Sequence, residues 1–390
     1  MAKRLFANPL FKFLVTVAAP LIALFCIYFK VAEYYQIVVI LFMINVILTA
    51  SLNITNGFIG IFSMGQAGFM AIGAYAGSLL TMSADLKISR IPGIPEWLAN
   101  VQLPFIPALI IAGMVAAAAA VIFGFPVLRA KGHYLAVMTL GMIIIIKAIL
   151  DNNSNLTNGA KGISGMERFS TLPVVFAVMI VSLFFLYRMT KSAFGRSMAA
   201  IRSDADAASS LGINATKYRM IAFVVSAFFG AVGGALWAHL QQTIAPSLFY
   251  FSRTFSIIEM SVLGGMSTLS GAFPGAAIVT FVPQILANFE NGFKIFGFDV
   301  PALNGLSAIV MSIVFILVII KWRGGVTRGS EYIVNAMFGK DTWTGILRKQ
   351  TYIDFWNILC GGFKNSIHYH PHTIEEKEQE KKNEQEKNEQ

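Results

Sequence analysis

The sequence predicts an all-α polytopic integral membrane protein with about ten transmembrane helices, some of them broken at glycines. Of its 390 residues, 56% are hydrophobic and 13% are charged, and the mean hydropathy is +0.66. Soluble chains carry roughly a quarter charged residues. Apolar runs near the length of about 20 residues that spans a bilayer recur along the chain. The composition excludes an ordinary soluble enzyme.

The apolar runs predict the spans in chain order. The first run follows the basic start Met1 to Arg4, but no small-residue cleavage pattern comes after it, so we expect a retained span rather than a signal peptide. The long run 256–287 contains Gly264, Gly265, Gly271, Pro274 and Gly275 and is split around Ser270 and Gly271. The ten predicted spans are 13–29, 34–52, 58–81, 103–128, 134–150, 172–187, 220–239, the two halves of 256–287, and 304–320.

The charges of the loops predict the orientation. One face carries eleven basic residues against Asp204 and Asp206, and the other carries seven basic against seven acidic residues. Since cytoplasmic loops are enriched in Lys and Arg, both termini are predicted to be cytoplasmic. The net charge of +10 therefore reflects orientation, and no nucleic-acid partner is expected. The basic residues of the inner face are Lys3, Arg4, Lys12, Arg129, Lys131, Arg188, Lys191, Arg196, Arg202, Lys217 and Arg219.

Two parts of the chain are predicted. Residues 1–325 form the transmembrane domain, with an inner loop at 188–218, and residues 326–390 form a charged cytoplasmic tail that is disordered from about 373. The alternating His368, His370 and His372 permit a metal site, but a solvated cluster is favoured about tenfold, so no metal is assigned.

Enzyme motifs are missing from the sequence. It contains no G-x-x-x-x-G-K-[ST] phosphate loop, no H-E-x-x-H, no C-x-x-C and no G-x-S-x-G. We expect no catalytic residue, no cofactor bound by this chain and no ATP hydrolysis by the chain itself.

Two glycine-rich segments stand out as candidates for function. The first is Gly57 to Gly68, followed by Gly73 and Gly77, and the second is Gly264 to Gly271. Small residues at such spacing permit close helix packing, whereas a broken helix would line a water-filled path. Packing is favoured at roughly 60 to 40, and both interpretations can hold. The candidate path residues are Gly57, Gly60, Ser63, Gly65, Gln66, Glu259, Gly264 and Gly265.

Two ionisable residues fall inside predicted spans. Lys147 precedes Asp151 by four residues, so we expect an ion pair near the end of a span. Glu259 is either a functional carboxylate facing a cavity or partner helix, or a structural hydrogen-bonding group near the interface, with similar weight.

The inner loop 188–218 contains a predicted amphipathic helix over Met198 to Leu211, which suits docking into the groove of a partner. Its string Asp206-Ala207-Ala208-Ser209-Ser210-Leu211-Gly212 resembles the EAA-x-x-x-G loop of ABC importer permeases, with Asp in place of Glu. In that family the loop is a coupling helix seated on the ATPase. The resemblance implies coupling roles for Asp206, Ala207, Ala208 and Gly212.

Four stretches together resemble the LivM-type permease of branched-chain amino acid ABC importers: Ser51 to Tyr75, Leu128 to Leu140, Ser192 to Tyr218 and Ile257 to Ala276. The likeness spans roughly residues 34 to 325. It implies a multi-pass protein of a bacterial inner membrane that imports Leu, Ile and Val by alternating access. The implied partners are a LivH-type permease, two ATPases that bind ATP and Mg²⁺, and an extracytoplasmic binding protein.

Three alternatives remain. The first is an importer of the same class with another cargo, because Gln66 stands where the family usually has His, and relatives with similar motifs carry urea or short amides. A carrier that works alone on a cation gradient would use Glu259 as its ion site. A membrane scaffold without transport leaves the paired glycine segments unexplained.

Overall fold

The computed structural model describes residues 32–130, 134–290, 293–295, 298–300, 305–321 and 325–326. All of them belong to one compact unit, Met1–Arg328. The predicted span 13–29 and nearly all of the tail 326–390, with its three histidines, lie outside the described residues.

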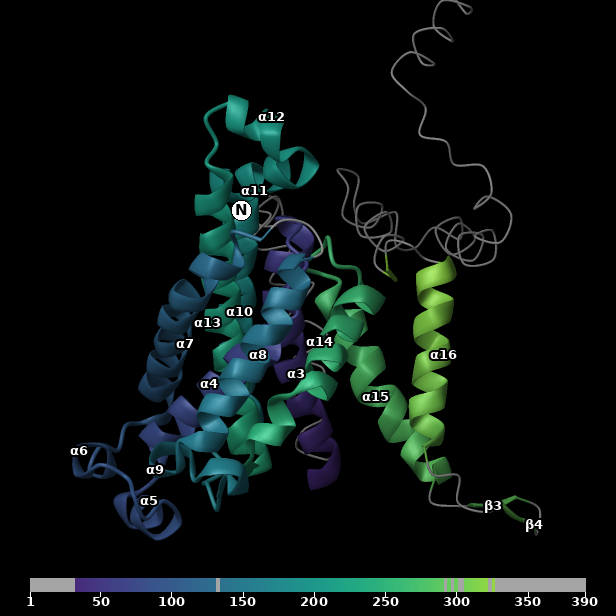
Figure 1. Ribbon diagram of the computed structural model, residues 1–390. Coiled ribbons are helices and arrows are strands. Elements are labelled where there is room, and N and C mark those ends of the chain that lie inside the picture. Colours follow the sequence, from purple (N-terminus) through teal and green to yellow (C-terminus); the bar gives the residue numbers. More distant parts are fainter. Residues whose placement is uncertain are drawn as a thin grey trace, which may run out of the picture. The chain divides into compact units, whose positions relative to one another are not determined.

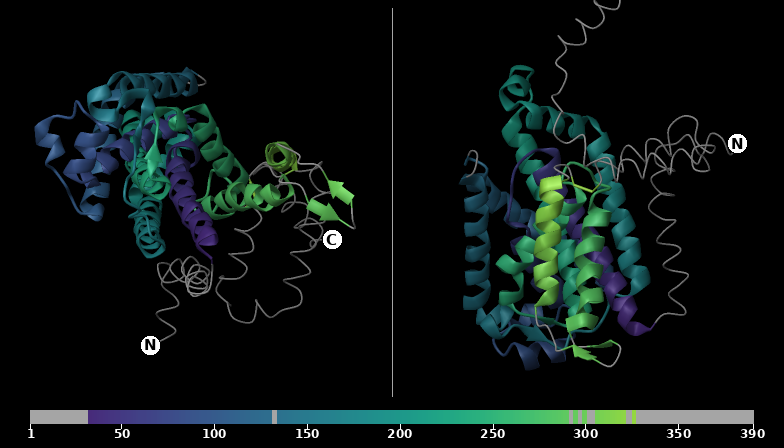
Figure 2. Two further views of the ribbon diagram at one scale, coloured as in Figure 1. Left: turned by 90° about the horizontal axis from the view of Figure 1, so that it is seen from below. Right: turned by 90° about the vertical axis from the view of Figure 1, so that its right-hand side faces the viewer.

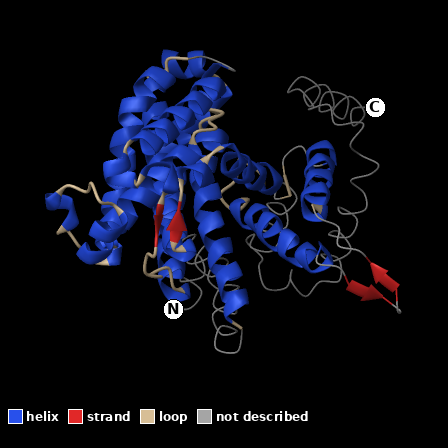
Figure 3. Ribbon diagram, turned by 60° about the horizontal axis from the view of Figure 1, so that its bottom comes forward, coloured by secondary structure: helices blue, strands red, loops and turns tan. Residues whose placement is uncertain are grey.

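The described chain is almost entirely helical (Figures 1 and 3). Its strands form two small antiparallel pairs, β1 with β2 and β3 with β4. The helices are α3 (Glu33–Asn53), the π-helix η1 (Ile54–Phe58), α4 (Gln66–Thr81), α5 (Ala84–Arg90), α6 (Glu96–Ala99), α7 (Phe105–Val127), α8 (Tyr134–Asn152), α9 (Ser154–Thr157), the 3-10 helix η2 (Gly159–Lys161), α10 (Leu172–Lys191), α11 (Ala193–Ser203), α12 (Ala205–Ser210), α13 (Ala215–Gln241), the 3-10 helix η3 (Pro246–Phe249), α14 (Phe251–Gly264), α15 (Ala272–Glu290) and α16 (Leu306–Lys321), and the strands are β1 (Ile163–Ser164), β2 (Thr243–Ile244), β3 (Phe293–Ile295) and β4 (Phe298–Val300).

Five helical segments are long and apolar enough to cross a membrane: Glu33–Phe58, Phe105–Val127, Tyr134–Asn152, Leu172–Lys191 and Ala215–Gln241. They confirm five of the predicted spans. Two further apolar stretches, Ala272–Ala287 and Ser307–Ile320, are shorter. The chain is therefore a multi-pass membrane protein, as its composition predicts.

The structure corrects one predicted segment and confirms the predicted interruption of another. The run 58–81 is helical only from Gln66 to Thr81, because residues 59–65 leave the helix. The long run 256–287 is interrupted as predicted, since α14 ends at Gly264 and α15 begins at Ala272.

Helix α3 lies at the centre of the described helices. It packs against α10, α13, α14 and α15, and 83% of the most apolar window of Glu33–Phe58 is buried in protein. Figure 2 shows α3, in purple, among the later helices. By contrast, only 33% of the most apolar stretch of each of α7, α8 and α10 is buried in protein. These helices therefore present apolar side chains outward, as lipid contact requires.

The two ends of the helices carry different connections. Helices α11 and α12 lie at one end, and α5, α6 and α9 lie at the other (Figure 1). At the α5 end, the buried Lys87 ammonium donates hydrogen bonds to the carbonyl oxygens of Leu98, at 3.1 Å, and Val101. Burial lowers the pKa of Lys87 because it disfavours the charged amine. Lys87 thereby ties α5 to the segment that leads into α7.

Candidate functional site

The first glycine segment interrupts a membrane helix in the structure. Helix α3 passes into the π-helix η1, and Gly60 has a φ of +76°, which side-chain-bearing residues rarely adopt. The Asn56 side chain closes the following turn, since its amide donates to the Ser63 oxygen at 3.1 Å and its Oδ1 accepts from the Ser63 nitrogen at 2.9 Å. Side chains thus satisfy backbone groups that the interruption frees, as a membrane protein requires.

The second glycine segment forms the connection between α14 and α15. Gly265 has a φ of +107°. A Cβ atom at Gly264 would lie 1.8 Å from the Gly271 oxygen, and one at Gly275 would lie 1.8 Å from the Met260 oxygen. The two helices therefore approach backbone to backbone, and the glycines serve close packing here.

The structure brings the two glycine segments together. A Cβ atom at Gly57 would lie 1.6 Å from the Met266 carbonyl oxygen. Asn53, just before η1, donates to the Thr268 oxygen at 2.9 Å and accepts from the Ser261 hydroxyl at 2.5 Å. The backbone of the first interruption consequently rests on the second, although more than 200 residues separate them in the chain.

Gln66 is buried where three helices meet. Its amide nitrogen donates to Ser51 Oγ of α3 at 2.7 Å, and its carbonyl oxygen accepts from Ser226 Oγ of α13 at 3.1 Å. Ser63 and Gly65 are also buried, and the Gly65 amide donates to Ser63 Oγ at 3.3 Å. In this structure Gln66 therefore joins helices.

Helices α4 and α13 pack closely along their glycines. A Cβ atom at Gly73 would lie 2.1 Å from the Ala231 oxygen, and one at Gly234 would lie 2.0 Å from the Met70 oxygen. The packing interpretation is correct for this stripe, because no larger residue fits between the two backbones.

Helix α14 carries two charged residues, Arg253 near its start and Glu259 past its middle. Glu259 is half-buried, two turns into the helix, and forms no hydrogen bond or ion pair with any residue that the structure describes. Arg253 lies in the first turn of α14. The Arg253 guanidinium donates to Asn45 Oδ1 at 3.3 Å, and its central carbon, Cζ, lies 5.3 Å from the centre of the Trp237 ring. The predicted Lys147–Asp151 ion pair is confirmed at 2.6 Å.

The inner loop folds as two short helices, so the single helix predicted over Met198 to Leu211 is wrong. The chain is extended at Asp204, with φ −155° and ψ 113°, and its carboxylate accepts hydrogen bonds from the amides of Asp206 and Ala207 at 2.9 and 3.0 Å. Asp204 is thus the N-cap of α12. Because Asp204 is extended and caps α12, α11 ends at Ser203 and α12 begins at Ala205.

The EAA-like string lies mostly on the surface at the α12 end. Asp206 and Ala207 are exposed, Ala208 is buried, and Leu211 is 81% exposed. Gly212 is exposed with a φ of +82° and has no neighbour within 4 Å of its Cβ position. The segment therefore presents a short capped helix and an exposed leucine at the surface.

Arg202 was not among the predicted site residues. Its guanidinium donates to the Gly57 carbonyl oxygen, and its Cγ lies 3.0 Å from a Cβ position at Gly60. The inner loop and the first glycine segment are therefore in direct contact. The sequence signals only a basic residue in a basic loop, so a contact between residues 145 positions apart could not be predicted.

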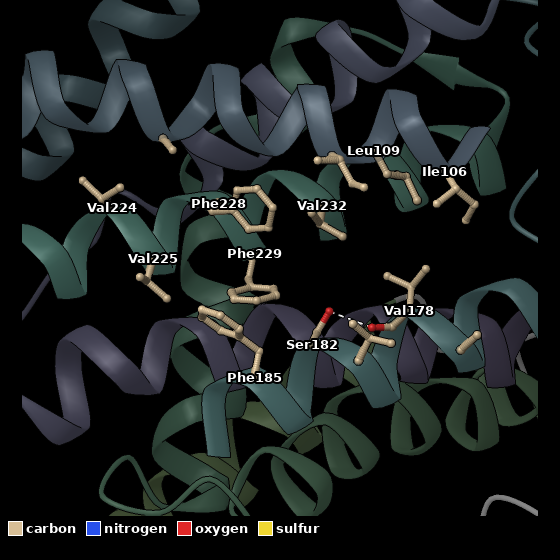
Figure 4. A pocket seen from close by; sticks show the side chains of 14 residues that line it. Ile106, Leu109, Val178, Ser182, Phe185, Val224, Val225, Phe228, Phe229 and Val232 are labelled. Atoms are coloured by element: carbon tan, nitrogen blue, oxygen red, sulfur yellow. Dashed lines mark hydrogen bonds between the residues drawn. The ribbon is translucent and has the colours of Figure 1, made fainter. Parts of the chain in front are cut away.

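An apolar groove of about 720 Å³ lies between α7, α10 and α13. Figure 4 shows its lining, which includes Leu109, Phe185, Phe228 and Val232. The labelled Ser182 hydroxyl is engaged with the Val178 oxygen at 2.7 Å. A polar or charged solute would lack hydrogen-bonding partners there, so the groove suits hydrocarbon.

These features define a class of protein: a multi-pass membrane component with interrupted helices that meet at one end beside an exposed capped helix. No group of three or more metal-ligating side chains occurs among the residues described.

The chain belongs to the family described as branched-chain amino acid transport system / permease component, whose model matches residues 34–319. It is 30% identical over 303 residues to the high-affinity branched-chain amino acid transport system permease protein LivM of Salmonella typhimurium and to that of Escherichia coli. Each match covers 69% of this chain and 66% of the relative, slightly less than two thirds of its length.

A more distant relative is the permease protein LivH of the same Salmonella system, 26% identical over 57% of this chain and 75% of LivH. No solved structure matches the chain significantly. The family and these relatives are permease components, so the chain is a transport subunit and not an enzyme.

Proposed function

We propose that this chain is the LivM-type permease of an ATP-driven importer that carries Leu, Ile and Val into a bacterial cytoplasm through the inner membrane. The proposal includes about ten crossings, cytoplasmic termini, a transmembrane domain over 1–325 and a cytoplasmic tail over 326–390. A LivH-type permease, two ATPases that bind ATP and Mg²⁺, and an extracytoplasmic binding protein complete the importer. This chain binds no cofactor itself.

One observation supports this function above the others: the exposed EAA-like helix α12 belongs to the same loop that contacts the first glycine interruption, which in turn packs on the second. An ATPase that binds α12 differently in two states would shift the equilibrium between two arrangements of these helices. Asp206, Ala207, Ala208 and Gly212 are the coupling residues in this mechanism. A carrier that works alone has no use for α12.

The interrupted helices supply the path. Gly60 is exposed and Glu259 is half-buried, so these two are the path candidates that a solute or the second permease can reach directly. Gly57, Ser63, Gly65, Gln66, Gly264 and Gly265 are buried and act by shaping the backbone around the path. Since specificity rests on the binding protein, the cargo is tested with that protein present.

The deciding experiment reconstitutes the complete importer in vesicles and measures radiolabelled leucine uptake. We expect uptake that requires ATP, the binding protein and intact ATPases, with an ATPase variant lacking its P-loop lysine as control. Uptake by the chain alone on a cation gradient would favour the Glu259 carrier. ATP-driven uptake of urea or acetamide in place of leucine would keep the class and change the cargo.

A further inference from the structure

Arg202 belongs to a helix of the inner loop, and its side chain reaches the first glycine segment. It lies near the C-terminus of α11, two residues before Asp204, the N-cap of α12. Its guanidinium hydrogen-bonds the Gly57 oxygen, while its aliphatic stem lies against Gly60. Two separate parts of the side chain thus contact two residues of the same interruption.

The Gly57 carbonyl is a group that needs such a partner. The last carbonyls of a helix have no donor within the helix, and Gly57 lies in the final turn of the π-helix η1. These carbonyls also form the negative end of the helix dipole, where a cation is favoured. An arginine supplies several N–H donors and a charge that persists at any physiological pH.

The same glycine rests on the second interruption. The close approach of Gly57 to the Met266 carbonyl leaves no room for a side chain between the two backbones. Ser261 and Thr268 are joined through Asn53, one turn before Gly57. A shift of the Gly57 carbonyl must therefore displace Met266 or be resisted by it, because packed backbones are not continuously deformable.

Helix α11 is attached to the body of the protein on one side only. Met198 and Ile201 are buried, while Arg196, Arg202 and Ser203 are exposed. Helix α12 follows after the extended residue Asp204. Helix α12 also contacts α13 directly, but the stretch that contains Arg202 is the part of this loop that reaches the first glycine segment.

From these contacts we propose that Arg202 is the positioning residue that transmits displacement of α12 to both glycine interruptions, through the Gly57 carbonyl and then Met266. The inference rests on the proposed function, because it gives α12 an ATPase to move it. It adds a residue outside the EAA-like string and a route across the two halves of the chain.

The test compares Arg202→Met, which keeps the stem and removes the donors, with Arg196→Met, which removes an exposed charge from the same helix. In the full importer, we expect Arg202→Met to keep basal ATPase activity within about twofold. Leucine uptake and the ATPase stimulation by loaded binding protein should fall at least about fivefold, as the loss of an allosteric coupling predicts. Arg196→Met should match the unsubstituted importer, and Arg202→Lys should lie between. Uptake and stimulation within about twofold of the unsubstituted importer in Arg202→Met would overturn the proposal.

A second measurement needs neither partners nor transport. In a chain with Cys26→Ser and Cys360→Ser, the exposed Ser267 beside Met266 is replaced by Cys and its labelling by a maleimide is timed. We expect Arg202→Met, but not Arg196→Met, to change the labelling rate at least about fivefold, since the second interruption loses its support. Equal rates would refute the contact route even if Arg202→Met prevents assembly. If the unsubstituted importer shows no ATP-driven uptake, the proposed function fails while this labelling result still stands.

Discussion

Single glycines in this protein are required by the contacts at each position rather than by their number. Gly57 meets a carbonyl oxygen of the second interruption, whereas Gly141 in α8 has no atom within 4 Å of its Cβ position. The two positions look alike in the sequence, since both are glycines in apolar surroundings. Backbone contact between distant segments distinguishes them.

We predict that Gly57→Ala destabilises the protein by at least about 2 kcal/mol, because the added methyl group overlaps Met266 and neither backbone can move freely. Gly141→Ala should be neutral or stabilise by up to about 1 kcal/mol, the helix-propensity gain. Thermal unfolding in detergent, followed by fluorescence, measures both. Similar unfolding temperatures for the two variants would contradict the backbone contact.

Gln66 shows what the sequence reveals about a site residue and what it omits. Its glycine-rich surroundings indicate a special backbone, and the structure has one just before it. Its partners Ser51 and Ser226 lie 15 and 160 residues away. The sequence therefore predicts that Gln66 is unusual, whereas the hydrogen bonds across α3, α4 and α13 appear only when the fold is known.

At the scale of elements, hydropathy predicts long helices better than their interruptions. Runs such as 103–128 and 172–187 coincide with α7 and α10, because a span in lipid must hydrogen-bond its own backbone. The start of α4 is predicted eight residues early. Residues 58–65 are as apolar as a membrane helix, but the chain turns at Gly60, and the Asn56 side chain hydrogen-bonds the backbone of Ser63 instead.

The capped helix α12 provides a test at the same scale. Gly212 follows α12 with φ +82°, and no neighbouring atom lies within 4 Å of the position that a Cβ atom would occupy. We predict that Gly212→Val lowers uptake and transport-linked ATP hydrolysis several-fold, because a β-branched residue is strained in this conformation and displaces Leu211. Gly212→Asn, which tolerates this conformation, should retain most activity. Unchanged uptake and ATP hydrolysis in Gly212→Val would show that the coupling assignment is wrong.

At the scale of the whole molecule, the loops sort to two ends as their charges predict. The basic loop of α11 and α12 lies at one end, and the segments α5, α6 and α9 lie at the other (Figure 1). The fold itself is the same in either orientation. The enrichment of Lys and Arg in cytoplasmic loops therefore predicts which end faces the cytoplasm.

Orientation is tested with single cysteines in a chain carrying Cys26→Ser and Cys360→Ser. Ser89 of α5 and Ser209 of α12 are both exposed. In spheroplasts, we predict that a membrane-impermeant maleimide labels Ser89→Cys, and that it labels Ser209→Cys only after permeabilisation. The reverse pattern would invert the proposed topology and remove α12 from any cytoplasmic ATPase.

The central position of α3 has a consequence for biosynthesis. Asn45 hydrogen-bonds Thr280, which is synthesised 235 residues later, and Asn53 hydrogen-bonds Thr268, 215 residues later. At about 5–20 residues per second, a ribosome needs roughly ten to fifty seconds to supply these partners. During that interval the carboxamides of Asn45 and Asn53 lack these hydrogen-bonding partners, so the packing around α3 is completed only after α15 has been synthesised.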